Sequence, residues 1–120
     1  MKISEVAKRT GLSISTIRFY ESSGLCPLIK RGSDGKRAFS AKDTDWLLLL
    51  ASLRATGMSL SDMRAFAALY ASGDETILQR KTALLAHRRS LADRQAELDR
   101  CRAILDRKLQ RYDEILGDQR

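Results

Sequence analysis

The sequence predicts a mainly α-helical fold in which short helices and a small β-hairpin precede one long helix. Glycines and serines divide roughly the first seventy residues into short amphipathic segments, whereas neither glycine nor proline interrupts the stretch between Gly73 and Gly117. A chain of 120 residues has room for one compact domain and one extended element. We therefore expect two domains, at residues 1–72 and 73–120.

Two short helices joined by a tight turn are expected at the start of the chain. Ser4 can cap a helix that ends at Gly11, and Ser13 can cap a second helix that turns Ile14 and Ile17 inward. Four other side chains of the second helix are left largely outward: Ser15, Thr16, Arg18 and Tyr20. This pattern is typical of a helix-turn-helix, whose second helix enters the major groove of DNA.

Residues 28–39 lack a helical pattern and predict a small β-hairpin. Its turn falls at residues 32–35. Three cations lie around the tip: Arg31, Lys36 and Arg37. Cations in such a place are suited to lie along a phosphate backbone.

Two further helices are expected to supply most of the core. Ser40, followed three residues later by Asp43, resembles the start of a capping box, and the helix that follows is expected to end at Gly57. Ser59 and Asp62 repeat this start signal for the second helix.

A single helix of about 65 Å is expected over residues 74–116. Apolar side chains along it follow the heptad pattern of a coiled coil: Ile77, Leu84, Leu91, Leu98, Leu105, Leu109, Tyr112 and Leu116. The companion heptad positions before residue 109 are mostly polar: Lys81, Arg88, Gln95 and Arg102. We therefore expect a homodimer through this helix, paired antiparallel rather than as a tightly zipped parallel dimer. A lone solvated helix is the alternative, which so long an apolar stripe disfavours.

Positive charge is concentrated at the front of the chain. The formal net charge is +7, and residues 1–42 alone hold nine Lys or Arg against three Asp or Glu. Such a patch favours a polyanionic partner, because neutralising phosphates releases counterions. The alternative is a charge that serves solubility alone.

Several other classes of protein are disfavoured. The longest apolar run, residues 46–51, is too short to span a bilayer, and the first residues resemble no leader peptide, so we expect a cytoplasmic protein. Cys26 and Cys101 lie far apart and His87 is the only histidine, a pattern that predicts no metal site, disulfide or cofactor. No nucleophile with a base and no phosphate-binding glycine loop indicates an enzyme.

An ordered set of motifs resembles the N-terminal domain of MerR-family regulators. It consists of Ile3-Ser4-Glu5-Val6-Ala7, Gly11-Leu12-Ser13, Thr16-Ile17-Arg18-Phe19-Tyr20-Glu21, Gly24-Leu25, Pro27, then Gly35, Arg37 and Phe39, and finally Gly57-Met58-Ser59-Leu60. With the long helix, the resemblance covers nearly the whole chain.

The resemblance implies a winged helix-turn-helix dimer, joined by an antiparallel coiled coil, that binds a palindromic promoter with an overlong spacer. Such regulators untwist and bend the spacer, so that they act on RNA polymerase indirectly through the DNA. They regulate transcription as activators or repressors.

The resemblance also assigns DNA contacts to particular residues. The recognition helix would use Ser15, Thr16, Arg18 and Tyr20. The first wing would use Arg31, Lys36 and Arg37, and the second wing Arg54 and Ser59, mainly on phosphates. Phe39 replaces the tyrosine that is usual there and cannot make a hydroxyl contact. Core packing is the alternative role of Tyr20 and Phe39.

Within the family, the chain resembles the small branch that responds to aldehydes and to nitrosative or thiol stress. Ser52 stands where members of that branch typically carry a cysteine. Cys101 and Cys26 are the remaining candidates for a sensor thiol, and a plain buried thiol is the alternative for each. The paired cysteines of metal sensors and the appended domain of drug sensors are not found here.

Two other functions stay open at this point. Some MerR-like domains with a helical tail act as protein-binding adaptors that modulate chaperones and bind no DNA. The basic residues Arg18, Arg31 and Arg37 argue against that role here. A phage-type accessory factor for recombination shares the wing but usually lacks a long dimerising helix.

Overall fold

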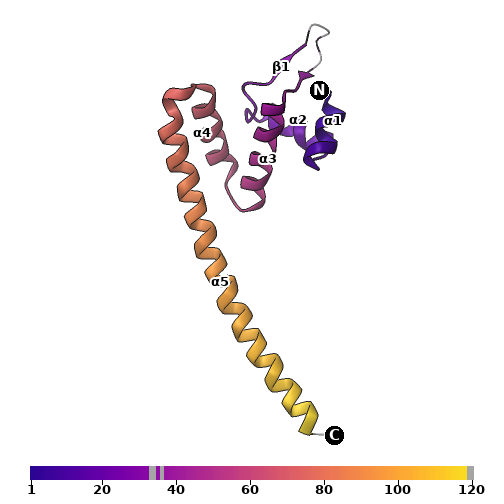
Figure 1. The fold of residues 1–120 in the computed structure, drawn as a ribbon, viewed down its shortest axis with the longest axis vertical. Coiled ribbons are helices and arrows are strands. Elements are labelled where there is room, and N and C mark those ends of the chain that lie inside the picture. Colours follow the sequence, from indigo (N-terminus) through magenta and orange to yellow (C-terminus); the bar gives the residue numbers. More distant parts are fainter. Residues whose placement is uncertain (33–34, 36, 119–120) are drawn as a thin grey trace. The chain divides into compact units, whose positions relative to one another are not determined.

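The computed structural model describes residues 1–32, 35 and 37–118 and is mainly α-helical, as predicted (Figure 1). The elements are α1 (Ile3–Thr10), α2 (Ile14–Ser22), β1 (Lys30–Arg31), β2 (Arg37–Ala38), α3 (Ala41–Ala55), α4 (Leu60–Ala71), the 3₁₀ turn η1 (Asp74–Thr76) and α5 (Ile77–Asp118). The chain forms two compact units, Met1–Ala83 and Leu84–Arg120. The predicted functional boundary between residues 72 and 73 stays a prediction.

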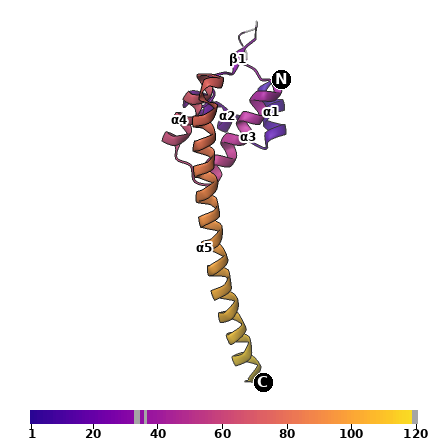
Figure 2. The same ribbon diagram turned by 60° about the vertical axis from the view of Figure 1, so that its left-hand side comes forward.

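The turn between α1 and α2 is built as the sequence predicts. Gly11 ends α1 in the left-handed conformation with φ 73°, and its N–H donates to the carbonyl of Ala7. The side chain of Ser13 caps α2 by accepting from the backbone N–H of Thr16. The prediction for Ser4 is wrong, because α1 already starts at Ile3. Helix α1 packs against both α2 and α3 (Figure 2).

The predicted hairpin is present as two antiparallel strands. Lys30 pairs with Ala38, and Arg31 pairs with Arg37. Directly after β2, the backbone of Phe39 forms two hydrogen bonds with Met1: the amino group of Met1 donates to the Phe39 carbonyl at 2.7 Å, and the Phe39 N–H donates back at 3.1 Å. The base of the hairpin is thereby fixed to the start of the chain.

Helices α3 and α4 begin at the predicted serines. Ser40 and Asp43 form a complete capping box, and Ser59 caps α4 by accepting from the N–H of Asp62. Six side chains are fully buried and form the centre of the core: Val6, Ile17, Leu25, Leu47, Leu50 and Met63. Since these come from α1 to α4 and the loop after α2, the first unit has one continuous core.

Trp46 of α3 connects three parts of this core. Its indole N–H donates to the carbonyl of Leu25 at 2.8 Å, in a buried bond that spans 21 residues of sequence. Its ring stacks on two rings of α4, with centroid distances of 5.5 Å to Phe66 and 4.1 Å to Tyr70. Trp46 therefore joins α3, α4 and the loop that follows α2.

A short corner connects α4 to α5. The Thr76 hydroxyl hydrogen-bonds with the carbonyls of Leu69 and Gly73, and Arg80 donates to the Thr76 hydroxyl oxygen and to the Gly73 carbonyl. The guanidinium of Arg80 also lies 5.5 Å from the centroid of the Tyr70 ring. The long helix starts at Ile77, three residues later than predicted, because the 3₁₀ turn precedes it.

Helix α5 is one continuous element of 42 residues, which confirms the predicted long helix. It passes through Gly117, where the sequence predicted its end, and stops at Asp118. Among its described residues none is buried. No helix in the described part of the chain is long and apolar enough to cross a membrane.

Replacing Trp46 with phenylalanine should lower the free energy of unfolding by about 2–3 kcal/mol. The buried Leu25 carbonyl would lose its donor and the smaller ring would leave a void. Urea titration at fixed protein concentration measures this change. Tyr70→Phe is the matched control, since it keeps the stacked ring and should change stability by less than about 0.5 kcal/mol. Equal effects of the two substitutions would contradict the role of the indole N–H.

Candidate nucleic-acid interface

The outward face of α2 is the first part of the candidate interface. Ser15 and Arg18 are exposed. Thr16 is half-buried, and its hydroxyl oxygen accepts from the Ser13 hydroxyl at 2.8 Å, so it belongs to the cap network of the helix. Phe19 is 46% exposed, which is unusual for a phenylalanine. The sequence analysis did not select Phe19, although its position next to Arg18 was the available signal.

Tyr20 does not face outward as predicted, because only 5% of it is exposed. It follows Ile17 by three residues and therefore continues the inward face of α2. Burial raises the pKa of its hydroxyl, while the positive charge of Arg54 acts in the opposite direction. The structure thus brings together two residues that the sequence assigned to different DNA contacts, Tyr20 on α2 and Arg54 on α3.

The hairpin supplies the second part of the interface. Lys30 on β1 is exposed. Arg31 and Arg37 lie in the paired strands, but only their backbone is described, and Lys36 lies outside the described residues. Phe39 is buried at the end of the hairpin, so the packing role weighed for it is the one the structure shows.

The third part is the connection between α3 and α4. Arg54 lies in the last turn of α3 and is exposed, and Ser59 is exposed at the start of α4. The Ser59 oxygen accepts from the backbone of Asp62, which leaves its O–H able to donate to a phosphate. Near this connection, Arg64 of α4 donates to the carbonyl of Ser23 at 3.0 Å and fixes the end of α2.

A shallow hollow lies beside the hairpin. Its lining consists of Leu28, Lys30, Ala38, Ser40, Lys42, Asp43 and Tyr70. Lys42 approaches the Tyr70 ring to 5.7 Å from the centroid. Two lysines face one carboxylate, and that carboxylate already accepts from the Ser40 N–H in the capping box. The hollow therefore extends the positive surface of the wing.

Residues 1–68 match the family model of MerR HTH family regulatory proteins, and residues 44–108 match the model described as MerR, DNA binding. The chain belongs to the MerR family. An uncharacterized HTH-type transcriptional regulator of Haemophilus influenzae is 39% identical over 108 residues, which cover 90% of this chain and 80% of that protein. The HTH-type transcriptional regulator AdhR of Bacillus subtilis is 34% identical over 93 residues, which cover 78% of this chain and 66% of AdhR.

Solved structures of MerR-family proteins have the same fold. HiNmlR, described as a MerR family regulator lacking the sensor domain and bound to promoter DNA, superposes with a TM-score of 0.84 and 37% identity, over 94% of this chain and 90% of HiNmlR. A putative MerR family regulator from Listeria monocytogenes gives a TM-score of 0.86 and 34% identity, over 94% and 86% of the two chains. This MerR-family chain is therefore a DNA-binding transcriptional regulator, and the adaptor alternative is not supported.

The two cysteines of this MerR-family protein differ in their surroundings. Cys26 is buried, and burial, followed by the charges of Glu21 and Asp43, raises the pKa of its thiol to about 12. A sensor thiol needs a low pKa and access to solvent, so this environment disfavours Cys26 as a sensor. Cys101 is exposed on α5. Within the described residues, no group of three or more His, Cys, Asp or Glu side chains could hold a metal ion.

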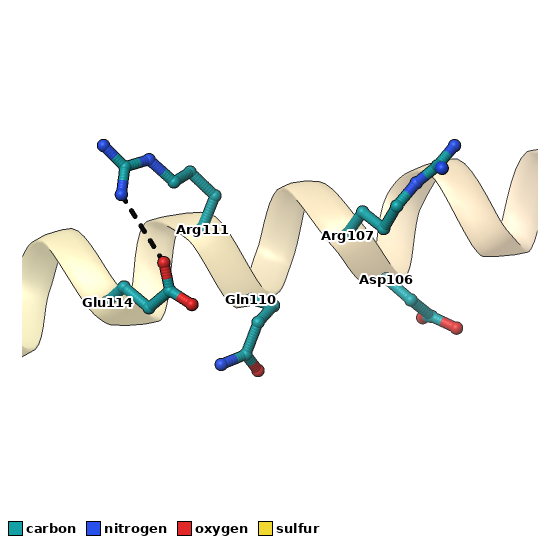
Figure 3. A pocket seen from close by; sticks show the side chains of 5 residues that line it. All are labelled: Asp106, Arg107, Gln110, Arg111 and Glu114. Carbon is teal, nitrogen blue, oxygen red and sulfur yellow. Dashed lines mark hydrogen bonds and ion pairs between the residues drawn. The ribbon is translucent and has the colours of Figure 1, made fainter.

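A second hollow lies along α5 and is lined by residues of that helix alone, as Figure 3 shows. The residues are Asp106, Arg107, Gln110, Arg111 and Glu114. Arg111 and Glu114 form an exposed ion pair at 3.5 Å. A groove on the surface of one helix cannot enclose a small ligand, so we do not regard it as a ligand site.

Cys26 should stay unmodified by a thiol reagent in the folded protein. With a pKa of about 12, about one thiol in ten thousand is ionised at pH 8. In a Cys101→Ser variant we expect almost no modification at pH 8 in buffer and one thiol per chain in urea, measured by mass spectrometry. Cys26→Ser, which leaves only the exposed Cys101, is the control and should react at once. Rapid modification of Cys26 in the folded protein would contradict the burial described here.

Proposed function

We propose that this MerR-family regulator acts in the cytoplasm as a homodimer that binds a palindromic promoter and distorts its spacer. The exposed Arg18 on a capped, well-packed recognition helix is the observation that carries the proposal. The excess of positive charge over residues 1–42 supports it, because this segment contains both the recognition helix and the wing. The similar protein HiNmlR is bound to promoter DNA in its crystal structure, which supports the same partner for this chain.

The contacts divide into those that read bases and those that hold the backbone. Ser15, Arg18 and Phe19 extend from the outward face of α2 and are placed to meet base edges and sugars in the major groove. Lys30, with Arg31, Lys36 and Arg37 of the wing, would hold phosphates on one side. Arg54 and Ser59 would hold phosphates on the other side, with the N–H groups at the start of α4 adding to the binding of an anion.

Tyr20 has a different role in this proposal from the one the resemblance implied. Its ring is buried and holds α2 in place, so the contact that remains available is through the hydroxyl beside Arg54. We propose that Tyr20 positions Arg54 toward a phosphate and makes no contact with base edges.

Two recognition helices in one dimer have a fixed separation, and a spacer of a different length must deform to meet both. Bending a site of this size costs on the order of 1–6 kcal/mol. The phosphate contacts of the two wings would offset that cost. RNA polymerase would then respond to the altered spacer without a direct contact, whether as activation or as repression. A role in aldehyde or other stress responses remains a prediction from the resemblance.

Arg18→Ala should remove specific operator binding and leave the fold unchanged. Loss of one base-reading arginine costs on the order of 1–3 kcal/mol. Fluorescence anisotropy on the promoter of the protein's own gene, compared with scrambled DNA, measures this change. Arg89→Ala removes the same charge from the exposed surface of α5 and is the matched control. Equal affinity of Arg18→Ala and wild type for the operator would overturn the assignment of α2.

Dimerisation should depend on the apolar stripe of α5. Leu109 is 59% exposed in the single chain, and an aspartate there would be buried without a partner in each copy. We expect Leu109→Asp to weaken dimerisation by about a hundredfold or more in sedimentation equilibrium. Gln110→Asp adds the same charge one residue further along, away from the stripe, and should leave the dimer intact. A monomeric wild-type protein at micromolar concentration would contradict the proposed dimer.

A further inference from the structure

Charged residues on α5 follow the same seven-residue repeat as the apolar stripe, but their sign changes along the helix. Four residues after a stripe residue, the first half carries cations, Lys81 and Arg88, where the second half carries Leu109 and Leu116. Directly after a stripe residue, the second half carries acids: Asp99, Asp106 and Asp113. Cations thus belong to the first half of this edge of the helix, and acids to the second half.

Four of these charges have no partners within the described part of the chain. Lys81, Arg88, Asp106 and Asp113 are all exposed, and none of them forms an ion pair or a side-chain hydrogen bond among the described residues. In Figure 3, Asp106 and its neighbour Arg107 point to different sides of the helix. Glu114, which follows Asp113, differs, because it pairs with Arg111. The described helix therefore uses Glu114 internally and leaves Asp106 and Asp113 available to a partner.

We infer that a second copy of the chain supplies the missing counterions in one particular antiparallel register. In this register Lys81 lies beside Asp113 of the partner subunit, and Arg88 lies beside Asp106 of the partner subunit. Both pairs fit one alignment, because a step of seven residues forward on one helix matches a step of seven backward on the other. The inference rests on the proposed homodimer and adds its register.

The same alignment also brings apolar residues together. It sets Ile77 nearly level with Leu116 of the partner subunit, and Leu84 nearly level with Leu109 of the partner subunit. In an antiparallel pair, like edges of the two helices meet, so the basic first half of one edge faces the acidic second half of the other. The cations at companion positions, which looked unfavourable in a stripe, thereby have a partner, and their long stems can cover apolar surface.

Other arrangements leave the charges unpaired. A parallel dimer would stack Lys81, Arg88 and Arg102 each on its own copy, which is unfavourable for like charges. An antiparallel dimer shifted by one heptad toward the C-termini would carry Lys81 and Ile77 past the last described acids of the partner. Exposed ion pairs contribute little to affinity individually, so we expect these pairs to select orientation and register more than to hold the dimer together.

The register sets a distance that a spin label can report. Glu114 lies on the outer side of α5, and its pair with Arg111 is exposed, so Glu114→Cys is a mild site for a label. A Cys101→Ser background leaves only the buried Cys26, which should not react. At 1.5 Å per residue, the two labels of the dimer should lie about 50 Å apart in this register. The shifted register gives about 40 Å, and a parallel dimer gives less than about 20 Å.

Charge reversal tests the ion pairs themselves. Lys81→Glu with Arg88→Glu should weaken dimerisation at low salt by about tenfold or more, because each reversal occurs twice in the dimer. Adding Asp106→Lys and Asp113→Lys to the same chain should restore the dissociation constant to within about threefold of wild type. Glu114→Lys makes a similar change on the outer side of the helix and is the matched control, with no expected effect.

The outcomes separate this inference from the proposed dimer. A label distance near 50 Å together with rescue by the second pair of reversals supports the register. A dimer with labels near 40 Å or closer than 20 Å, or reversal without effect or rescue, overturns the register and leaves the dimer standing. A wild-type chain that stays monomeric overturns both.

Discussion

The buried hydrogen bond from the Trp46 indole to the Leu25 carbonyl is the contact on which the placement of the recognition helix depends. Leu25 directly follows α2, so the bond fixes the end of that helix against α3. The same indole stacks on Tyr70 of α4, and Arg64 of α4 donates to Ser23 at the end of α2. A nine-residue helix has too few contacts to hold its own orientation. Neighbouring helices supply that orientation, and Arg18 can therefore present a fixed geometry to DNA.

Local signals in the sequence predicted most elements, because capping and chain reversal depend on a few neighbouring residues. The capping serines of α2, α3 and α4 and the positive φ of Gly11 are of this kind. Ser4 failed as a cap, because a good capping residue does not by itself decide where a helix begins. The face of Tyr20 failed because an amphipathic side chain on a short helix fits either side. The bond between Trp46 and Leu25 could not be predicted, since nothing local links residues 21 positions apart.

The two halves of the chain obtain their stability in different ways. The first unit buries aromatic and aliphatic side chains from four helices around one core. Helix α5 has no buried residue among those described, although large apolar side chains follow its stripe. Isolated helices gain little from propensity alone, so an exposed stripe of this length is stabilised chiefly when a partner covers it. Order in α5 and dimerisation are therefore expected to be linked, which explains why its sequence encodes an interface more clearly than a core.

The corner between α4 and α5 connects these two sources of stability. Any force that a deformed spacer exerts on the recognition helix must reach the dimer through this corner, since no other covalent link exists. Thr76 closes the last turn of α4 by bonding to Leu69, and Arg80 returns from α5 to Gly73 and to the Tyr70 ring. Tyr70 in turn stacks on Trp46, whose indole holds the end of α2. A continuous set of contacts thus runs from the first turn of α5 to the recognition helix. Such a chain of packed groups suits a regulator that must resist the DNA it bends, because a loose corner would let the dimer adapt to the promoter and leave the spacer undistorted.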